Sequence, residues 1–392
     1  LGNALYFNDQ VAEAEAVWRA ALGPAERQRK AGGTAWLQIR QGLVNARVQR
    51  GQAQEGLMDM LALRQDLIRS PLHDGPVMAQ FMNDLGDVYF QASREEDALQ
   101  AFGQAIAYDE THPDGPAARD IREQLLSRSN RVYTRWGLCD LEGARQDSAE
   151  LRGVLAQRLG QRHALLLNQT RLGVMVANEL ARYDEALALI ERQLPLVDRS
   201  KPEWGKWHVA FLSDRALAWA HSGKSQAAAA LAQDQIDFFL ADQGPEAYGA
   251  EIAAQARLDA LIALGQTELA RAEGARLWAA FQQRWRPIRQ SEFLLRRAVA
   301  AWPDRAAVQA HLQAVEERTR QLAPREMVHG RLCALRAWTE GVQDGAVWQR
   351  CENGLQALPP GHPARQALAD LRAWAQSGRR DVPATRLLPL LY

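Results

Sequence analysis

The sequence contains only three cysteines in 392 residues, Cys139, Cys333 and Cys351, and no CxxC pair. This scarcity excludes a zinc site built from cysteines and a fold held together by a disulfide framework. Cys333 and Cys351 lie on two consecutive predicted helices, on either side of a predicted turn near Gly341 to Asp344. Two interpretations stay open for them: a disulfide across this hairpin, or two buried thiols, the commoner state of free cysteine.

The sequence also has no excess of charge of either sign. Lys and Arg together number 47, as do Asp and Glu, so the formal net charge is zero. Without a block of like charges, non-specific binding to nucleic acid is not expected. No window approaches the roughly 20 apolar residues of a membrane-spanning helix, and the first residues show no signal-peptide pattern. We therefore expect neither nucleic-acid binding nor membrane insertion by this segment.

Motifs that carry chemistry are missing too. The eight histidines show no HExxH spacing, and neither GxSxG nor GxGxxG after a predicted strand occurs. The segment from Ser222 to Ser225 resembles the end of a phosphate-binding loop, but Ala218 stands where that motif needs its first glycine, and the segment follows a helix. We expect no catalytic site, no cofactor and no metal, and interpret the chain as a binding protein.

A repeat dominates what the sequence does contain. Hydrophobic residues make up 47% of the chain, largely Ala and Leu with few β-branched runs, which is typical of packed helices. A small residue recurs at the expected start of every second helix, with successive spacings of 42, 42, 46, 42, 42 and 42: Ala14, Gly56, Ala98, Ala144, Ala186, Ala228 and Ala270. Such a period indicates a stack of helical hairpins.

The residues around the small position recur as well. The third unit has Leu85-Gly86 and Tyr89, then Ala98 and Phe102, and the first unit has Leu1-Gly2, Ala14 and Trp18 at the same offsets. This pattern resembles the tetratricopeptide repeat, whose small residues let two antiparallel helices approach closely while large ones fill the gap to the next hairpin. The resemblance implies an all-α, right-handed α-solenoid of antiparallel hairpins. The 42-residue period and the His-Pro pairs at 112–113 and 362–363 resemble the kinesin-light-chain type and its relatives in bacterial signalling proteins.

The repeat divides the chain into two predicted regions. Residues 1–286 are expected to form seven hairpins of about 42 residues, and residues 287–392 degenerate hairpins that cap the solenoid. In the second region we expect helices at 288–302, 304–322, 325–340, 345–358, 363–376 and 383–391, with prolines at their boundaries. The apolar end, residues 387–392, is expected to dock on the last hairpin, with contact to a partner chain as the alternative. Because the sequence starts within a repeat, we interpret it as a piece of a longer protein.

Two tryptophan clusters are candidate interfaces, with core packing as the alternative. Trp204 and Trp207 are expected in the link between the fifth and sixth hairpins, and Trp285 lies between two arginines at the end of the seventh. An exposed tryptophan flanked by cations is typical of binding surfaces.

In proteins that this chain resembles, first helices line a concave groove. Transferring the inward positions predicts a peptide-binding groove made of Asn45, Gln80, Asn83, Asp87, Phe90, Ser129, Tyr133, Trp136, Asn168 and Arg171. Gln38, Gln41, Gln91, Asn178, Ser213, His221, Gln255 and Asp259 fall on the same face. Amide side chains can pair with both the N–H and the C=O of an extended peptide, and aromatic rings supply pockets. A cationic clamp for a chaperone tail is not expected, because Gln80 and Asp84 stand at its positions.

We therefore expect a protein- or peptide-binding regulatory region, a sensor or adaptor, of a larger bacterial signalling protein such as a Ser/Thr kinase or a transcriptional regulator. Two alternatives remain: a free-standing scaffold for a secretion or envelope assembly, and an accessory region of an enzyme whose catalytic domain lies outside this chain.

Overall fold

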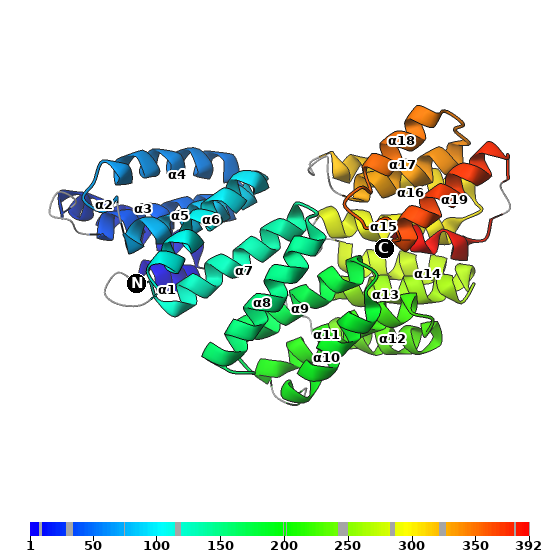
Figure 1. Ribbon diagram of the computed structural model, residues 1–392, viewed down its shortest axis with the longest axis horizontal. Coiled ribbons are helices and arrows are strands. Elements are labelled where there is room, and N and C mark those ends of the chain that lie inside the picture. Colours follow the sequence, from blue (N-terminus) through cyan, green and yellow to red (C-terminus); the bar gives the residue numbers. More distant parts are fainter. Residues whose placement is uncertain are drawn as a thin grey trace. The chain divides into compact units, whose positions relative to one another are not determined.

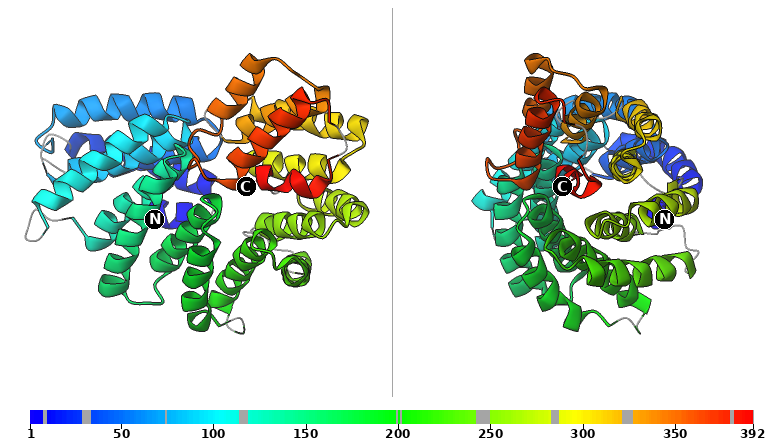
Figure 2. Two further views of the ribbon diagram at one scale, coloured as in Figure 1. Left: turned by 45° about the vertical axis from the view of Figure 1, so that its right-hand side comes forward. Right: turned by 90° about the vertical axis from the view of Figure 1, so that its right-hand side faces the viewer.

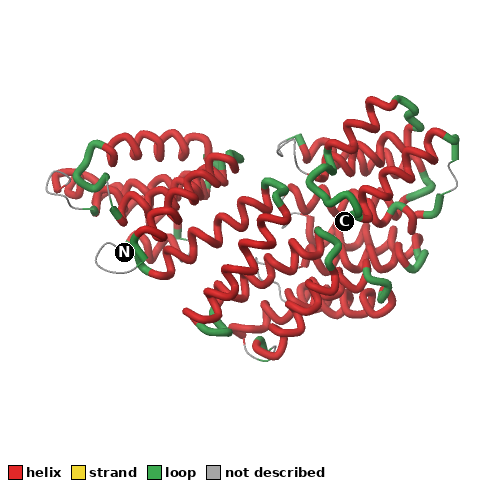
Figure 3. The backbone as a smooth tube through the Cα atoms, viewed as in Figure 1, coloured by secondary structure: helices red, strands yellow, loops and turns green. Residues whose placement is uncertain are grey.

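The computed structural model describes residues 1–7, 10–28, 34–73, 75–113, 119–198, 200, 202–241, 250–282, 287–320, 327–379 and 382–391. Within these ranges the chain contains helices and loops and no strand (Figure 3). The nineteen α-helices are α1 (Gly2–Phe7), α2 (Val11–Gln28), α3 (Ala35–Gln49), α4 (Ala53–Ile68), α5 (Pro76–Gln91), α6 (Glu95–Thr111), α7 (Ile121–Gly137), α8 (Leu141–Leu159), α9 (Ala164–Glu179), α10 (Tyr183–Gln193), α11 (Pro202–His221), α12 (Ser225–Ala241), α13 (Ala250–Ala263), α14 (Thr267–Phe281), α15 (Pro287–Ala301), α16 (Arg305–Thr319), α17 (Met327–Glu340), α18 (Gly345–Asn353) and α19 (Pro363–Gln376). Among the described helices, none is long and apolar enough to span a bilayer.

The helices pack as consecutive hairpins, as the repeat predicts (Figure 1). Within residues 1–138 and within residues 139–392, each helix packs on the next in sequence, and each first helix also packs on the first helix of the following hairpin, so that α1, α3, α5 and α7 lie side by side. The chain divides into two compact units, residues 1–138 and 139–392, and the boundary falls inside the single 46-residue spacing of the repeat. The predicted boundary at residue 286, between regular and degenerate hairpins, stays a prediction.

The recurring small residues lie where two helices of a hairpin meet. All seven, from Ala14 to Ala270, are buried in the first turns of second helices. Gly86 shows why the first helix needs a small residue too, because a Cβ added there would lie 2.5 Å from Cε1 of Phe102. Trp18 occupies the same place in the first hairpin and lies against Gly2 and Gly42. The close approach inferred from the repeat is therefore present.

The turns inside the hairpins share one backbone conformation. Gly51, Gly223 and Gly265 end first helices with φ of 81°, 84° and 70°, the left-handed values expected at such positions. The same position in three other hairpins is held by Ser93, Cys139 and Ala181, with φ of 57°, 57° and 56°. The turn is thus imposed by the hairpin even where no glycine is available, at a cost in backbone strain.

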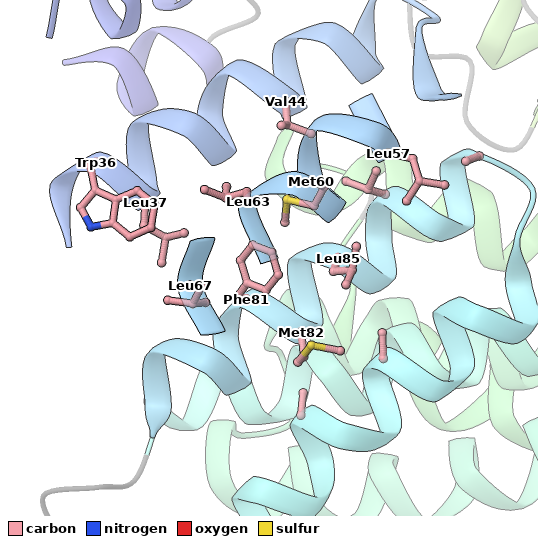
Figure 4. Packing of buried hydrophobic residues seen from close by; sticks show 14 of the residues in the cluster. Trp36, Leu37, Val44, Leu57, Met60, Leu63, Leu67, Phe81, Met82 and Leu85 are labelled. Atoms are coloured by element: carbon pink, nitrogen blue, oxygen red, sulfur yellow. The ribbon is translucent and has the colours of Figure 1, made fainter. Parts of the chain in front are cut away.

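The core of unit 1 is a layer of aliphatic and aromatic side chains between the hairpins (Figure 4). Trp36 from α3, Met60 from α4 and Phe81 from α5 are fully buried in it. These side chains hold the first helices in a fixed register, which sets the positions of the polar residues on their opposite face.

Unit 2 continues the hairpins from α8 to α19, and its last segment turns back onto earlier helices. Where a helix was expected at 383–391, the chain forms two short 3-10 helices, η4 (Ala384–Arg386) and η5 (Leu388–Leu391). Pro389 lacks the N–H that an α-helix would need there. The segment docks on α19, as expected, and also on α13 and α15, where Figure 2 shows it in red beside the yellow-green helices. Helix α18 also ends earlier than expected, at Asn353.

Two further expectations are settled in unit 2. Cys333 and Cys351 are joined as a disulfide, with 5.3 Å between their Cα atoms, so the pair of buried thiols is the wrong alternative. Trp204 and Trp207 do not lie in a link, because α11 begins at Pro202 and both rings pack, partly buried, on the cluster that contains Phe211. The Trp285 cluster and Lys201 lie outside the described residues.

Candidate peptide-binding groove

The face formed by the first helices of unit 1 is hollowed. A cavity of about 330 Å³ opens between α3, α5 and the start of α7. Its lining is polar apart from a few aliphatic groups and consists of Thr34, Leu37, Gln38, Gln41, Pro76, Val77, Gln80, Arg119, Asp120 and Glu123. Three of these are glutamines from the neighbouring first helices α3 and α5.

Asp84 on α5 lies next to this cavity and accepts hydrogen bonds from amides on two helices. Gln41 Nε2 donates to Oδ2 at 2.7 Å, and Gln80 Nε2 donates to Oδ1 at 3.0 Å. Burial raises the pKa of Asp84 to about 7, against which the hydrogen bonds from Asn83 and Gln80 and the charge of Arg119 act. Among the described residues Asp84 forms no ion pair, and the hydrogen bonds to its carboxyl group come from amides.

Arg119 is the only base among the described residues that line the cavity, and its guanidinium is already engaged. It makes a buried two-point ion pair with Asp109, Nε to Oδ1 at 2.8 Å and Nη2 to Oδ2 at 2.6 Å. Its Nη1 donates to Gln80 Oε1 at 3.0 Å, which fixes the orientation of that amide. The fork geometry holds Gln80 so that its NH₂ group faces Asp84.

A second carboxyl group lies one turn further along α5. Asp87 is exposed to solvent and accepts a hydrogen bond at 3.0 Å from Asn130 Nδ2 on α7, which also reaches Asn83 Oδ1 at 3.4 Å. Although part of the Asp87 side chain reaches solvent, desolvation of its carboxyl group raises its pKa to about 7, and the charge of Asp84 adds to the effect. Unit 1 therefore presents two carboxyl groups on one helix face without a cationic partner among the described residues.

The structure brings together only part of the predicted site. Gln80, Asn83 and Asp87 belong to one hydrogen-bond network. The others in unit 1 are half-buried or buried on the first helices α3, α5 and α7: Asn45, Phe90, Ser129, Tyr133 and Trp136. Asn168 and Arg171 belong to unit 2, and Arg171 is buried in an ion pair with Asp214 at 2.9 Å. The residues of the groove stay a prediction.

Three important members of the network were not in the predicted groove. From the sequence, Asp84 was considered only as a residue that rules out a cationic clamp. Asn130 and Arg119 were not predicted to have a role. The signal for Asp84 was present, because Gln80, Asp84 and Asp87 follow the spacing of one helix face. The signal for Arg119 was not, since it precedes α7 and reaches Gln80 only through the tertiary fold.

The corresponding face of unit 2 is charged and closed. Arg296 on α15 pairs with Asp259 on α13 at 3.0 Å, and His221 Nε2 on α11 lies 3.0 Å from the same carboxylate. Arg289 pairs with Glu292 at 2.7 Å. Only about 20 Å³ of space remains among these side chains, room for one water molecule. No group of three or more metal-ligating side chains occurs in the described part of the chain.

Comparisons with known proteins support the fold. No protein-family model matches the sequence, and no curated protein matches it either. Among solved structures, the apo form of RapI matches with a TM-score of 0.62 at 8% identity, over 96% of this chain and 95% of that one. The Rap conjugation gene regulator of plasmid pLS20, in complex with the Phr* peptide, matches with a TM-score of 0.52 at 10% identity, over 81% and 93%.

A kinesin-light-chain-like protein matches as well. BtubC (BKLC) from P. vanneervenii has a TM-score of 0.51 at 12% identity, over 60% of this chain and 92% of that one. At these identities the likeness concerns the fold alone. Together with the 42-residue period and the packing of consecutive hairpins, it identifies the chain as a tetratricopeptide-like repeat protein of the all-α solenoid type.

Proposed function

We propose that the chain is a peptide-binding regulatory protein whose ligand lies in the groove of unit 1, and that it binds rather than catalyses. The observation that carries this proposal is the 330 Å³ cavity between first helices, lined by Gln38, Gln41 and Gln80. Amides from successive helices offer both donors and acceptors to the main chain of an extended peptide. The fold shared with a conjugation gene regulator solved with its Phr* peptide supports the same function.

The charges of the groove favour a ligand with a basic side chain. Asp120 and Glu123 line the cavity, and Asp84 and Asp87 follow Gln80 on α5, while Arg119 is neutralised by Asp109. A Lys or Arg of the ligand would provide the missing positive partner, and a charge-assisted hydrogen bond to a carboxylate is among the stronger polar contacts. We further propose that the chain acts within a bacterial signalling system, which is supported by the fold that it shares with the conjugation gene regulator.

Two matched variants test the location of the site. Peptides selected from a random library on the purified chain are measured by fluorescence anisotropy against the wild type, Gln38→Ala and Gln100→Ala. Both glutamines are exposed, but Gln38 lines the groove and Gln100 lies on the second helix α6. We expect Gln38→Ala to weaken binding about five- to tenfold, roughly one hydrogen bond, and Gln100→Ala to leave it unchanged. Equal effects of the two changes would remove the groove of unit 1 as the site.

The charge preference has its own test. Binding of a peptide with one Lys is expected to strengthen between pH 6 and pH 8, as the two carboxyl groups on α5 lose their protons. Asp87→Asn is expected to remove about half of this dependence, because Asp84 still titrates, while a peptide with norleucine in place of Lys shows little. A Lys peptide whose affinity is the same at both pH values would contradict the electrostatic part of the proposal and leave the groove itself untouched.

A further inference from the structure

The inner face of unit 2 carries an arrangement that the packing of a solenoid does not require. Its first helices α9, α11, α13 and α15 place Asp214, Asp259 and Arg296 there, each at most 2% exposed. Charged residues are rarely buried to this degree, and hydrophobic ones would fill a permanent interior at lower cost. A charged inner face is what an open binding groove of this fold presents to a ligand.

The groove is closed by the segment from Val382 to Leu391. Leu387, Leu388, Leu390 and Leu391 are at most 7% exposed, and η5 lies against α13, α15 and α19. Leu391 forms part of the wall of the remaining 20 Å³ cavity. The segment thus lies across the first helices of the unit, as a bound peptide would.

Within the described residues, two hydrogen bonds join this segment to α15 and to the residue after it. Trp302 Nε1 donates to the carbonyl of Val382 at 2.6 Å, and Arg296 Nη2 reaches the carbonyl of Leu391 at only 3.5 Å. Three buried side chains of the cavity wall keep an atom without a hydrogen bond to any described residue: Nε of Arg331, 4% exposed, and Oδ1 of Asn178 and of Asp214, each 1% exposed. Such atoms in a native interior call for a ligand or a water.

From this we infer that the inner face of unit 2 is a second peptide-binding groove, and that residues 382–391 occupy it as an exchangeable internal ligand. Its external ligand is a short Leu- and Pro-containing segment that also supplies an acceptor for Arg331 and a donor for Asn178. Exchange is feasible because the segment is held only weakly. The conformational entropy lost when it becomes ordered is about as large as the hydrophobic free energy gained by burying its four leucines. The tether gives the internal segment an effective concentration on the order of millimolar, so an external peptide binds well only when the segment is released.

The test uses the full chain and a labelled peptide with the sequence of residues 382–391, acetylated and amidated. Leu390→Asp places a charge in the apolar part of the contact and is expected to release the segment. The matched control is Leu269→Asp, since Leu269 is 44% exposed on α14. We expect the peptide to bind Leu390→Asp at least tenfold more tightly than the wild type or the control.

Equal binding of the peptide to wild type, control and Leu390→Asp, with all three folded by circular dichroism, would overturn the inference. A second measurement on the wild type covers the case in which Leu390→Asp does not fold. Hydrogen exchange of the amides of residues 387–391 is expected to be at least tenfold faster than that of the protected amides of α19, because the segment leaves the groove without global unfolding. Exchange of both at the same slow rate would mean that the segment is a permanent part of the core and refute the inference. Neither readout involves unit 1, so the proposed function stands or falls separately.

Discussion

Replacing Asp84 by Asn tests the electrostatics of the unit 1 groove directly. Burial raises the pKa of this carboxyl group from its ordinary value of 3.8 to about 7, so the folded state holds a proton that the unfolded state releases above pH 4. The folded protein therefore loses stability as the pH rises through this window. The Asn side chain has nearly the shape of the neutral carboxyl group and cannot ionise. Asp84→Asn is expected to equal the wild type well below pH 3.8, to gain slightly at pH 4.5 and to be clearly more stable at pH 8.

The size of the effect follows from the shift. About 3 pKa units correspond to about 4 kcal/mol, and because the side chain is only half-buried we expect about half of this, about 2 kcal/mol, at pH 8. Urea unfolding followed by circular dichroism at pH 4.5 and pH 8 measures the difference. The control is Asp59→Asn, which removes only an exposed ion pair with Arg47 and should change stability by less than about 1 kcal/mol at either pH. A variant less stable than the wild type at pH 8, or the same gain at both pH values, would refute the reasoning.

Three further predictions concern the framework that holds the grooves. Gly86→Ala drives a methyl group into the ring of Phe102 and should cost about 1–2 kcal/mol, seen as a lower urea midpoint; a rise would mean that helix propensity outweighs the close approach. Ala181→Gly relieves a left-handed residue and should stabilise by up to about 1 kcal/mol, whereas Ala188→Gly, exposed inside α10, should destabilise by a similar amount; thermal melts with the same sign for both would contradict the strain. Cys333→Ala opens a loop of 18 residues and should cost about 3 kcal/mol, and a reducing agent should lower the melting temperature of the wild type but not of this variant.

The architecture could be predicted from the sequence because each hairpin needs a small residue at the same position, and this pattern therefore recurs along the chain. The small residues from Ala14 to Ala270 each report one close contact between helices, and their spacing fixes the hairpin length without any long-range information. The left-handed turns at Gly51, Gly223 and Gly265 could be predicted for the same reason. The equivalent turns at Cys139 and Ala181 carry no local signal, since only their place in the repeat identifies them.

The site was harder to predict because it depends on contacts that have no period. The register transferred from the repeat located Gln80 and Asp87 on the groove face, but the ion pair that orients Gln80 comes from Arg119, outside the helices. In unit 2 nothing in the sequence indicated that residues 388–391 would pack on α13 and α15, beside the predicted positions Asn178 and Gln255. A segment that folds back onto helices more than a hundred residues earlier leaves no trace in the spacing of the sequence.

The contact between α19 and α9 has a consequence for how unit 2 is made. His362 donates from Nε2 to the carbonyl of Glu179, 183 positions earlier, at 2.9 Å, while its Nδ1 accepts from the amide of Ala364. Hairpins that touch only their neighbours can fold one after another as the chain leaves the ribosome. The contact between His362 and Glu179 can form only after α19 has been synthesised, so unit 2 cannot complete its folding before then. During synthesis, the charged inner face of α9 to α15 therefore stays open to the cell until translation has passed residue 391.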